Sequence, residues 1–89
     1  MQKRTLLRYT EPAVKDLDKL DKNLSKRIVS KIETYTQDQP LLNAKRLNGV
    51  FEGLYRYRIG DYRAIFEYEE DKLIIIKIIM IRHRKDAYR

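Results

Sequence analysis

The first third of the chain has the hydrophobic spacing of a strand followed by helices. Residues 3–9 predict a short strand. Thr10 is a predicted helix N-cap, because the two residues after it suit a first helical turn. The charge of Glu11 favours the positive end of the helix dipole, and Pro12 needs no backbone N–H there. Apolar residues then recur at helical spacing, at Ala13, Leu17 and Leu20.

A second, longer helix is predicted to begin at Asn23, which is a suitable N-cap residue. Its apolar stripe consists of Leu24, Ile28, Ile32 and Tyr35. The helix is expected to end between Gln37 and Pro40, because the residue before a proline disfavours the helical conformation. Together the two helices form a helical hairpin.

From residue 54 onward the hydrophobic period becomes two, which is typical of strands. The segment before it, residues 41–53, is expected to be a connection. Three strands are predicted, over residues 54–59, 62–68 and 73–81, with turns at Gly60-Asp61 and at residues 69–72. The last strand is rich in isoleucine and suits a central position covered on both faces.

These elements predict a single domain over residues 1–89 with an α+β fold. An N-terminal strand and a helical hairpin precede an antiparallel three-stranded meander, and the helices pack on one face of the sheet. The longest apolar run, residues 73–81, is too short to span a membrane, and no signal peptide is visible. We therefore expect a soluble, cytoplasmic protein without a membrane partner.

The amino-acid composition limits the kinds of reactive and metal-binding site that the chain can form. The chain has no cysteine, which excludes disulfides, thiolate nucleophiles and cysteine-based metal sites. It has 20 Lys and Arg against 13 Asp and Glu, a net charge of +7. Such a surplus indicates either a polyanionic or acidic partner or ordinary solubility charge. The placement of the charges has to decide between these two interpretations.

Alternation along the predicted meander gathers arginines on one face of the sheet. If Tyr55, Tyr57 and Ile59 face the core, Arg56 and Arg58 face the other way. In the next strand Arg63 joins them, because its neighbours in the pattern are aromatic core residues. Asp61 and the acidic residues 69–71 are not expected to neutralise this cluster. The cluster is either a solvated face or a phosphate site, and arginine's paired binding of phosphate oxygens favours the second.

The basic tail, residues 82–89, could complete such a site. His83 is the only histidine, the residue type suited to proton transfer near neutral pH, although a lone histidine is more often a polar surface residue. Tyr88 is more often a hydrophobic anchor. No second histidine or carboxylate pair stands at ligand spacing, so no metal site is predicted.

Three runs of residues carry a family resemblance: Lys45-Arg46-Leu47-Asn48-Gly49, Tyr55-Arg56-Tyr57-Arg58-Ile59-Gly60-Asp61-Tyr62-Arg63, and His83-Arg84-Lys85-Asp86-Ala87-Tyr88. The chain resembles toxins of the RelE/ParE superfamily from type II toxin–antitoxin pairs. The terminal His-Arg-x-Asp-x-Tyr points to the RelE-like mRNA interferase branch and its microbial RNase fold.

This resemblance implies a metal-independent, ribosome-dependent endoribonuclease. Such toxins cleave mRNA in the ribosomal A site by attack of the ribose 2′-hydroxyl, and thereby inhibit translation. The implied partners are a cognate RelB-like antitoxin, the ribosome and A-site mRNA, without a cofactor. The alternatives are a ParE-like poison of DNA gyrase with the same fold and no nuclease activity, and a non-enzymatic RNA-binding module.

Site residues follow from the resemblance by position. The implied catalytic residues are Arg63 on the scissile phosphate, Arg84 on the leaving group, His83 as proton carrier, and Tyr88 as a base-stacking or proton-accepting residue. The implied RNA- and phosphate-binding residues are Lys45, Arg56, Arg58, Arg82 and Lys85.

Overall fold

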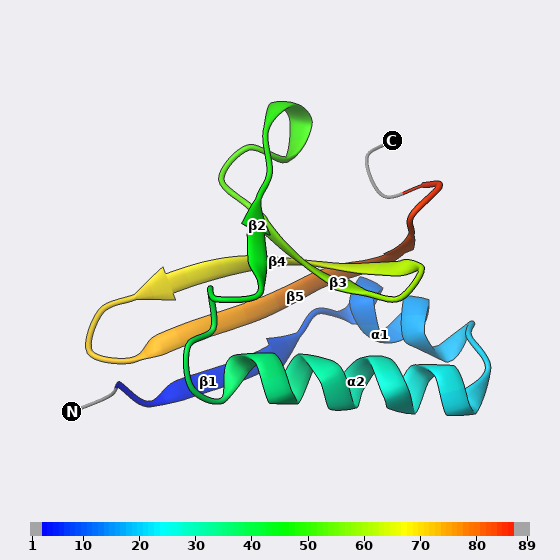
Figure 1. Cartoon of the computed structure of the whole chain (residues 1–89), viewed down its shortest axis with the longest axis horizontal. Helices are drawn as coiled ribbons and strands as arrows, with labels where there is room; N and C mark the ends of the chain where they lie inside the picture. Colours follow the sequence, from blue (N-terminus) through cyan, green and yellow to red (C-terminus); the bar gives the residue numbers. More distant parts are fainter. Residues whose placement is uncertain (1–2, 87–89) are drawn as a thin grey trace.

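The computed structural model of the protein describes residues 3–86 and confirms the α+β class (Figure 1). The elements, in chain order, are β1 (Thr5–Tyr9), α1 (Glu11–Asp18), α2 (Lys22–Thr36), β2 (Ala44–Arg46), the 3-10 helix η1 (Gly49–Phe51), β3 (Tyr55–Ile59), β4 (Tyr62–Glu70) and β5 (Ile74–His83). Within the described residues, neither helix is long and apolar enough to cross a membrane.

The strands form one sheet in the order β1-β5-β4-β3-β2. The predicted antiparallel meander of β3, β4 and β5 is confirmed, and β1 adds to it parallel to β5. The expectation that residues 41–53 are only a connection is wrong, because β2 pairs antiparallel with β3. Three residues with two basic side chains carry no hydrophobic alternation, so the sequence gives no sign of this strand. Beyond β2, the segment that contains η1 projects from the sheet (Figure 1).

The first predicted helix cap is confirmed and the second is wrong. Thr10 Oγ1 accepts a hydrogen bond from the Ala13 amide at 3.3 Å, and its hydroxyl donates to Ile79 O at 2.8 Å. The start of α1 is thereby tied to β5. The N-cap of α2 is Asp21, whose carboxylate accepts from the Asn23 amide at 3.1 Å.

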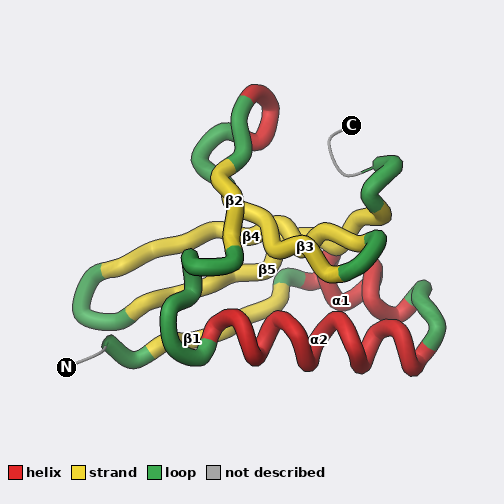
Figure 2. The backbone as a smooth tube through the Cα atoms, viewed as in Figure 1, coloured by secondary structure: helices red, strands yellow, loops and turns green. Residues whose placement is uncertain are grey.

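Both helices cover the same face of the sheet (Figure 2). The core between them contains Ala13 and Leu17 of α1, Ile28 and Ile32 of α2, and the strand residues Tyr57, Ile59, Ala64, Phe66, Ile74, Ile76, Ile78 and Ile81. Tyr57 is fully buried; its ring stacks on Phe66 at 4.4 Å, and its hydroxyl donates to Pro40 O at 2.6 Å. Helices cover only one face of β5, contrary to the expectation of two covered faces. The second face of the sheet is therefore left to the alternate residues.

Candidate nucleic-acid interface

Three arginines stand in register on the face of the sheet that the helices leave open. Arg58 of β3 is the strand partner of Arg63 of β4, and Arg63 is the partner of Arg82 of β5. Directly opposed residues of antiparallel strands point to the same face, with Cα atoms about 4.5–5.5 Å apart. Their neighbours along the strands face the core. Arg58, Arg63 and Arg82 therefore form a row, which we call the arginine row.

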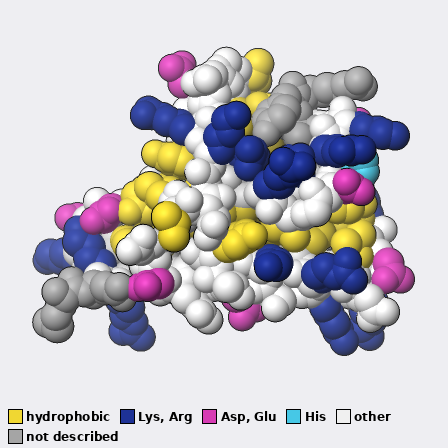
Figure 3. Space-filling view, in the orientation of Figure 1, with side chains coloured by type: hydrophobic (Ala, Val, Ile, Leu, Met, Phe, Trp, Pro, Cys, Tyr) yellow, Lys and Arg dark blue, Asp and Glu magenta, His cyan; other side chains and the backbone are white. Residues whose placement is uncertain are grey.

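A second row lies beside it, two residues along each strand. Lys45 of β2 pairs with Arg56, Arg56 with Ile65, and Ile65 with Met80. Ile65 is fully buried and Met80 half-buried, so this row consists of two cationic and two apolar side chains. Together the arginine row, Lys45 and Arg56 form the basic face. The space-filling view shows Lys and Arg side chains gathered on the side of the sheet away from the helices (Figure 3).

Arg63 has a structural contact in addition to its charge. Only 9% of the residue is exposed, and its Nη1 donates to Gly60 O and Tyr62 O, both at 3.0 Å. These carbonyls belong to the turn between β3 and β4, where Gly60 adopts a φ of +59° that favours glycine. Arg63 therefore supports this turn from the open face of the sheet.

The other two arginines of the row lack a compensating charge within residues 3–86. Arg58 and Arg82 are exposed, and the described residues give neither of them an ion pair. Arg82 Nε donates instead to Met80 Sδ at 3.4 Å. Further along the same face, Lys77 pairs with Glu67 at 3.8 Å. Like charges on adjacent strands cost free energy, so the charges of Arg58 and Arg82 favour an anionic partner.

Arg84 does not join the row. Its Nε lies 3.7 Å from Asp61 Oδ1, and its amide donates to Asp61 O at 2.7 Å. Asp61 therefore pairs with Arg84, which lies outside the predicted cluster of Arg56, Arg58 and Arg63, because β5 ends beside the turn that carries Asp61. Both side chains are more than half exposed. The leaving-group role of Arg84 stays a prediction, and the arginine that the register puts beside Arg63 is Arg82.

His83 lies on the helix side of the sheet, away from the basic face. Its strand partner is Tyr62, and the two rings meet edge to face at 5.3 Å and 85°. Leu24 and Arg27 of α2 line the same hollow. The Lys85 amide donates to His83 Nδ1 at 3.2 Å, and the Lys85 side chain is exposed beyond the sheet. The proton-carrying role of His83 stays a prediction, but the expected convergence with the arginines is not what the structure has.

A break in the pairing of β4 and β5 explains this placement. Ile65 pairs with Met80, but the next residue, Phe66, pairs with Ile78, so one residue of β5 is extra. Such a bulge reverses which face the following residues point to. It brings Arg82 onto the basic face and His83 onto the opposite one. Tyr88, predicted as a further site residue, lies outside the described residues.

The comparisons with known proteins identify the family of this chain. The family model described as the ParE toxin of the type II toxin–antitoxin system, parDE, matches residues 7–88. The chain belongs to this toxin family. Membership of the RelE/ParE superfamily, predicted from the sequence, is thereby confirmed.

Solved structures share the toxin's fold. The RelBE2 toxin–antitoxin complex of Mycobacterium tuberculosis matches with a TM-score of 0.77 and 25% identity over 94% of this chain and 100% of that chain. The RelE–RelB complex of Pyrococcus horikoshii gives 0.70 and 29% over 98% and 100%. A mutant of Escherichia coli RelE in the free state gives 0.72 and 19% over 98% and 88%, a likeness of fold. Among curated proteins, none matches the chain.

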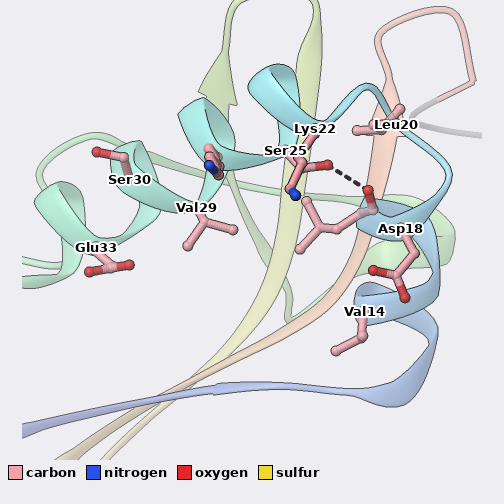
Figure 4. A pocket seen from close by; sticks show the side chains of 10 residues that line it. Val14, Asp18, Leu20, Lys22, Ser25, Val29, Ser30 and Glu33 are labelled. Carbon is pink, nitrogen blue, oxygen red and sulfur yellow. Dashed lines mark hydrogen bonds between the residues drawn. The ribbon is translucent and has the colours of Figure 1, made fainter.

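A hollow also lies between α1 and α2, away from the basic face (Figure 4). It has a volume of about 720 Å³, and its lining combines apolar residues such as Val14, Leu17 and Val29 with polar and charged ones. Ser25 Oγ donates to Leu17 O at 2.5 Å across its wall. Within residues 3–86, no group of His, Asp and Glu is placed to hold a metal ion.

Proposed function

We propose that this toxin is a metal-independent, ribosome-dependent endoribonuclease that cleaves mRNA in the A site. The observation that supports it is the row of Arg58, Arg63 and Arg82 on three adjacent strands, with uncompensated charge on its two exposed members. Guanidinium groups bind phosphate oxygens in pairs and stay charged at neutral pH. A poison that binds only a protein has no need of such a row.

The reaction requires no group beyond the chain's own cations and a proton acceptor and donor. The ribose 2′-oxygen loses its proton and attacks the adjacent phosphorus, forming a P–O2′ bond. The P–O5′ bond breaks, and the departing 5′-oxygen takes a proton. The products are a 2′,3′-cyclic phosphate and a 5′-hydroxyl. Fixed positive groups stabilise the additional charge of the phosphorane.

We propose that the described residues of the basic face bind the phosphates of the RNA. Arg63 and Arg82, directly opposed on β4 and β5, are proposed to bind the scissile phosphate. Arg58, Arg56 and Lys45, on β3 and β2, are proposed to hold the flanking RNA backbone. Tyr88 remains a predicted participant from the tail.

A DNA gyrase poison is the second candidate, since the matching family model describes a ParE toxin. The two candidate functions differ in whether they require the basic face. RNA cleavage requires Arg82, whereas gyrase inhibition without nuclease chemistry does not. Parallel assays of mRNA cleavage on ribosomes and of DNA supercoiling therefore separate them.

The test compares Arg82→Ala with Arg27→Ala in a translation reaction supplied with purified toxin. Arg27 is an exposed arginine of α2 on the opposite side of the sheet, so its replacement removes the same charge. Loss of an electrostatic contact to a transition state costs about 10²–10³ in rate. We expect that loss for Arg82→Ala and little change for Arg27→Ala. Equal cleavage by the two variants would contradict the assignment.

We further propose an antitoxin partner whose acidic segment covers the basic face. The M. tuberculosis and P. horikoshii structures that this chain resembles are toxin–antitoxin complexes. Opposite charge on the partner would compensate Arg58 and Arg82 and block RNA at the same time. Arg58→Ala should weaken binding of the co-encoded antitoxin, with a smaller dependence on salt, whereas Arg27→Ala should not.

A further inference from the structure

We propose that His83 is a positioning residue, which packs on Tyr62 to hold the end of β5 and so keeps Arg82 beside Arg63. Together with the Asp61–Arg84 pair it forms a latch between the β3–β4 turn and the chain that leaves β5. The activity readout of this inference rests on the proposed nuclease function, and its structural readout does not.

Three contacts join the two segments of the latch. The ring of His83 meets the ring of Tyr62 at 5.3 Å. The Arg84 amide donates to Asp61 O at 2.7 Å, and the Arg84 Nε lies 3.7 Å from Asp61 Oδ1. The ring contact on the helix side of the sheet and the ion pair beyond the sheet thus both hold the chain that leaves β5 against the β3–β4 turn.

The latch and the arginine row share residues. Tyr62 and Arg63 are consecutive on β4, and their partners His83 and Arg82 are consecutive on β5. Because consecutive side chains of a strand point to opposite faces, a ring that is held on the helix side holds the preceding arginine on the open face. Arg63 in turn donates to Tyr62 O, so the turn that receives His83 also orients Arg63.

The surroundings of His83 suit packing better than proton transfer. The sheet separates its ring from the basic face. Its Nδ1 already accepts from the Lys85 amide at 3.2 Å. The charged residues of this corner are Arg27 from α2 and Asp61 from the turn, with Arg84 and Lys85 next along the chain. A flat apolar ring could therefore replace the imidazole.

The decisive comparison is His83→Phe against His83→Ala. Phenylalanine keeps a ring against Tyr62 but cannot carry a proton. We expect His83→Phe to cleave ribosome-bound mRNA within about threefold of wild type, with an unchanged pH profile between about pH 5.5 and 8.5. His83→Ala should lose about tenfold or more, since misplaced catalytic groups cost up to about 10²-fold. A loss of about 10²-fold or more in His83→Phe, together with one limb of the pH profile, would overturn the proposal.

A second measurement detects opening of the latch and does not depend on RNA cleavage. Hydrogen exchange of the Arg84 amide, which donates to Asp61 O, reports opening of this contact. His83→Ala and Tyr62→Ala should each raise its exchange rate by about tenfold, and His83→Phe should not. Equal exchange in wild type and His83→Ala would refute the latch. If wild-type toxin cleaves no mRNA while the exchange rates change as expected, the nuclease proposal fails and the latch stands.

Discussion

Arg63→Ala is expected to destabilise the fold as well as the reaction. The guanidinium Nη1 donates to the carbonyls of Gly60 and Tyr62 at 3.0 Å each, and the residue is 9% exposed. A hydrogen bond that involves a charged group contributes about 1.5–3 kcal/mol. Gly60 is exposed, so water can replace part of what is lost there. We therefore expect a loss of about 2–3 kcal/mol in unfolding free energy.

For a domain of 89 residues this loss is large. One kcal/mol shifts the melting temperature by about 4–8 °C in a domain of this size, so Arg63→Ala should melt about 8–24 °C lower than wild type. Arg58→Ala, which removes an exposed arginine from the strand position opposite, should change stability by less than about 0.5 kcal/mol.

Urea unfolding followed by circular dichroism, with thermal melting in parallel, measures both variants. A melting temperature of Arg63→Ala within about 2 °C of Arg58→Ala would refute the structural role of Arg63. The comparison also decides how activity is interpreted. Cleavage by Arg63→Ala is informative only below its own unfolding transition, whereas Arg82→Ala tests the phosphate contact without that complication.

Three further predictions follow from the core and the basic face. Tyr57→Phe should lower the unfolding free energy by about 1–2 kcal/mol, because Pro40 O loses a buried donor. Tyr9→Phe should raise it by about 1 kcal/mol, because within the described residues the buried Tyr9 hydroxyl has no partner. Urea unfolding measures both changes. Burial raises the pKa of Tyr9 from 10.0 to about 12 and that of Tyr57 further. A tyrosine whose pKa is raised in the folded state contributes stability that is complete below pH 10 and is lost as the pH rises toward 12. The unfolding free energy should therefore be flat from about pH 7 to 9 and fall above pH 10. The fall should be less steep in Tyr9→Phe. Arg58→Ala should reduce the salt dependence of single-stranded RNA binding, measured by fluorescence anisotropy, by about 0.7 in the log–log slope per lost contact.

Local pattern was enough to predict one face of the sheet. Alternation along β3 put Tyr57 and Ile59 in the core and Arg56 and Arg58 on the other side, and the structure confirms each placement. Thr10 was likewise readable as a cap, because capping depends on the next three residues. These features depend on neighbours within one element, where the sequence carries the information.

The tail could not be placed in the same way. In β5 the core residues Ile74, Ile76 and Ile78 have even numbers, and continued alternation would put Arg82 with them and His83 on the basic face. The bulge reverses this order, so that Ile81 is the next core residue. A run of isoleucines offers no change of pattern at the point where one residue is extra. The pairing of β2 with β3 was hidden for a related reason, since it depends on register between distant segments.

The direct test of the basic face is to map the 3′ ends of ribosome-bound mRNA after a brief incubation with wild-type toxin, Arg82→Ala and Arg27→Ala. Wild type and Arg27→Ala should give 2′,3′-cyclic phosphate ends at A-site codons, and Arg82→Ala should give about 10²-fold fewer. Cyclic-phosphate ends at equal frequency in all three, or in none of them, would contradict the assignment of RNA cleavage to the arginine row.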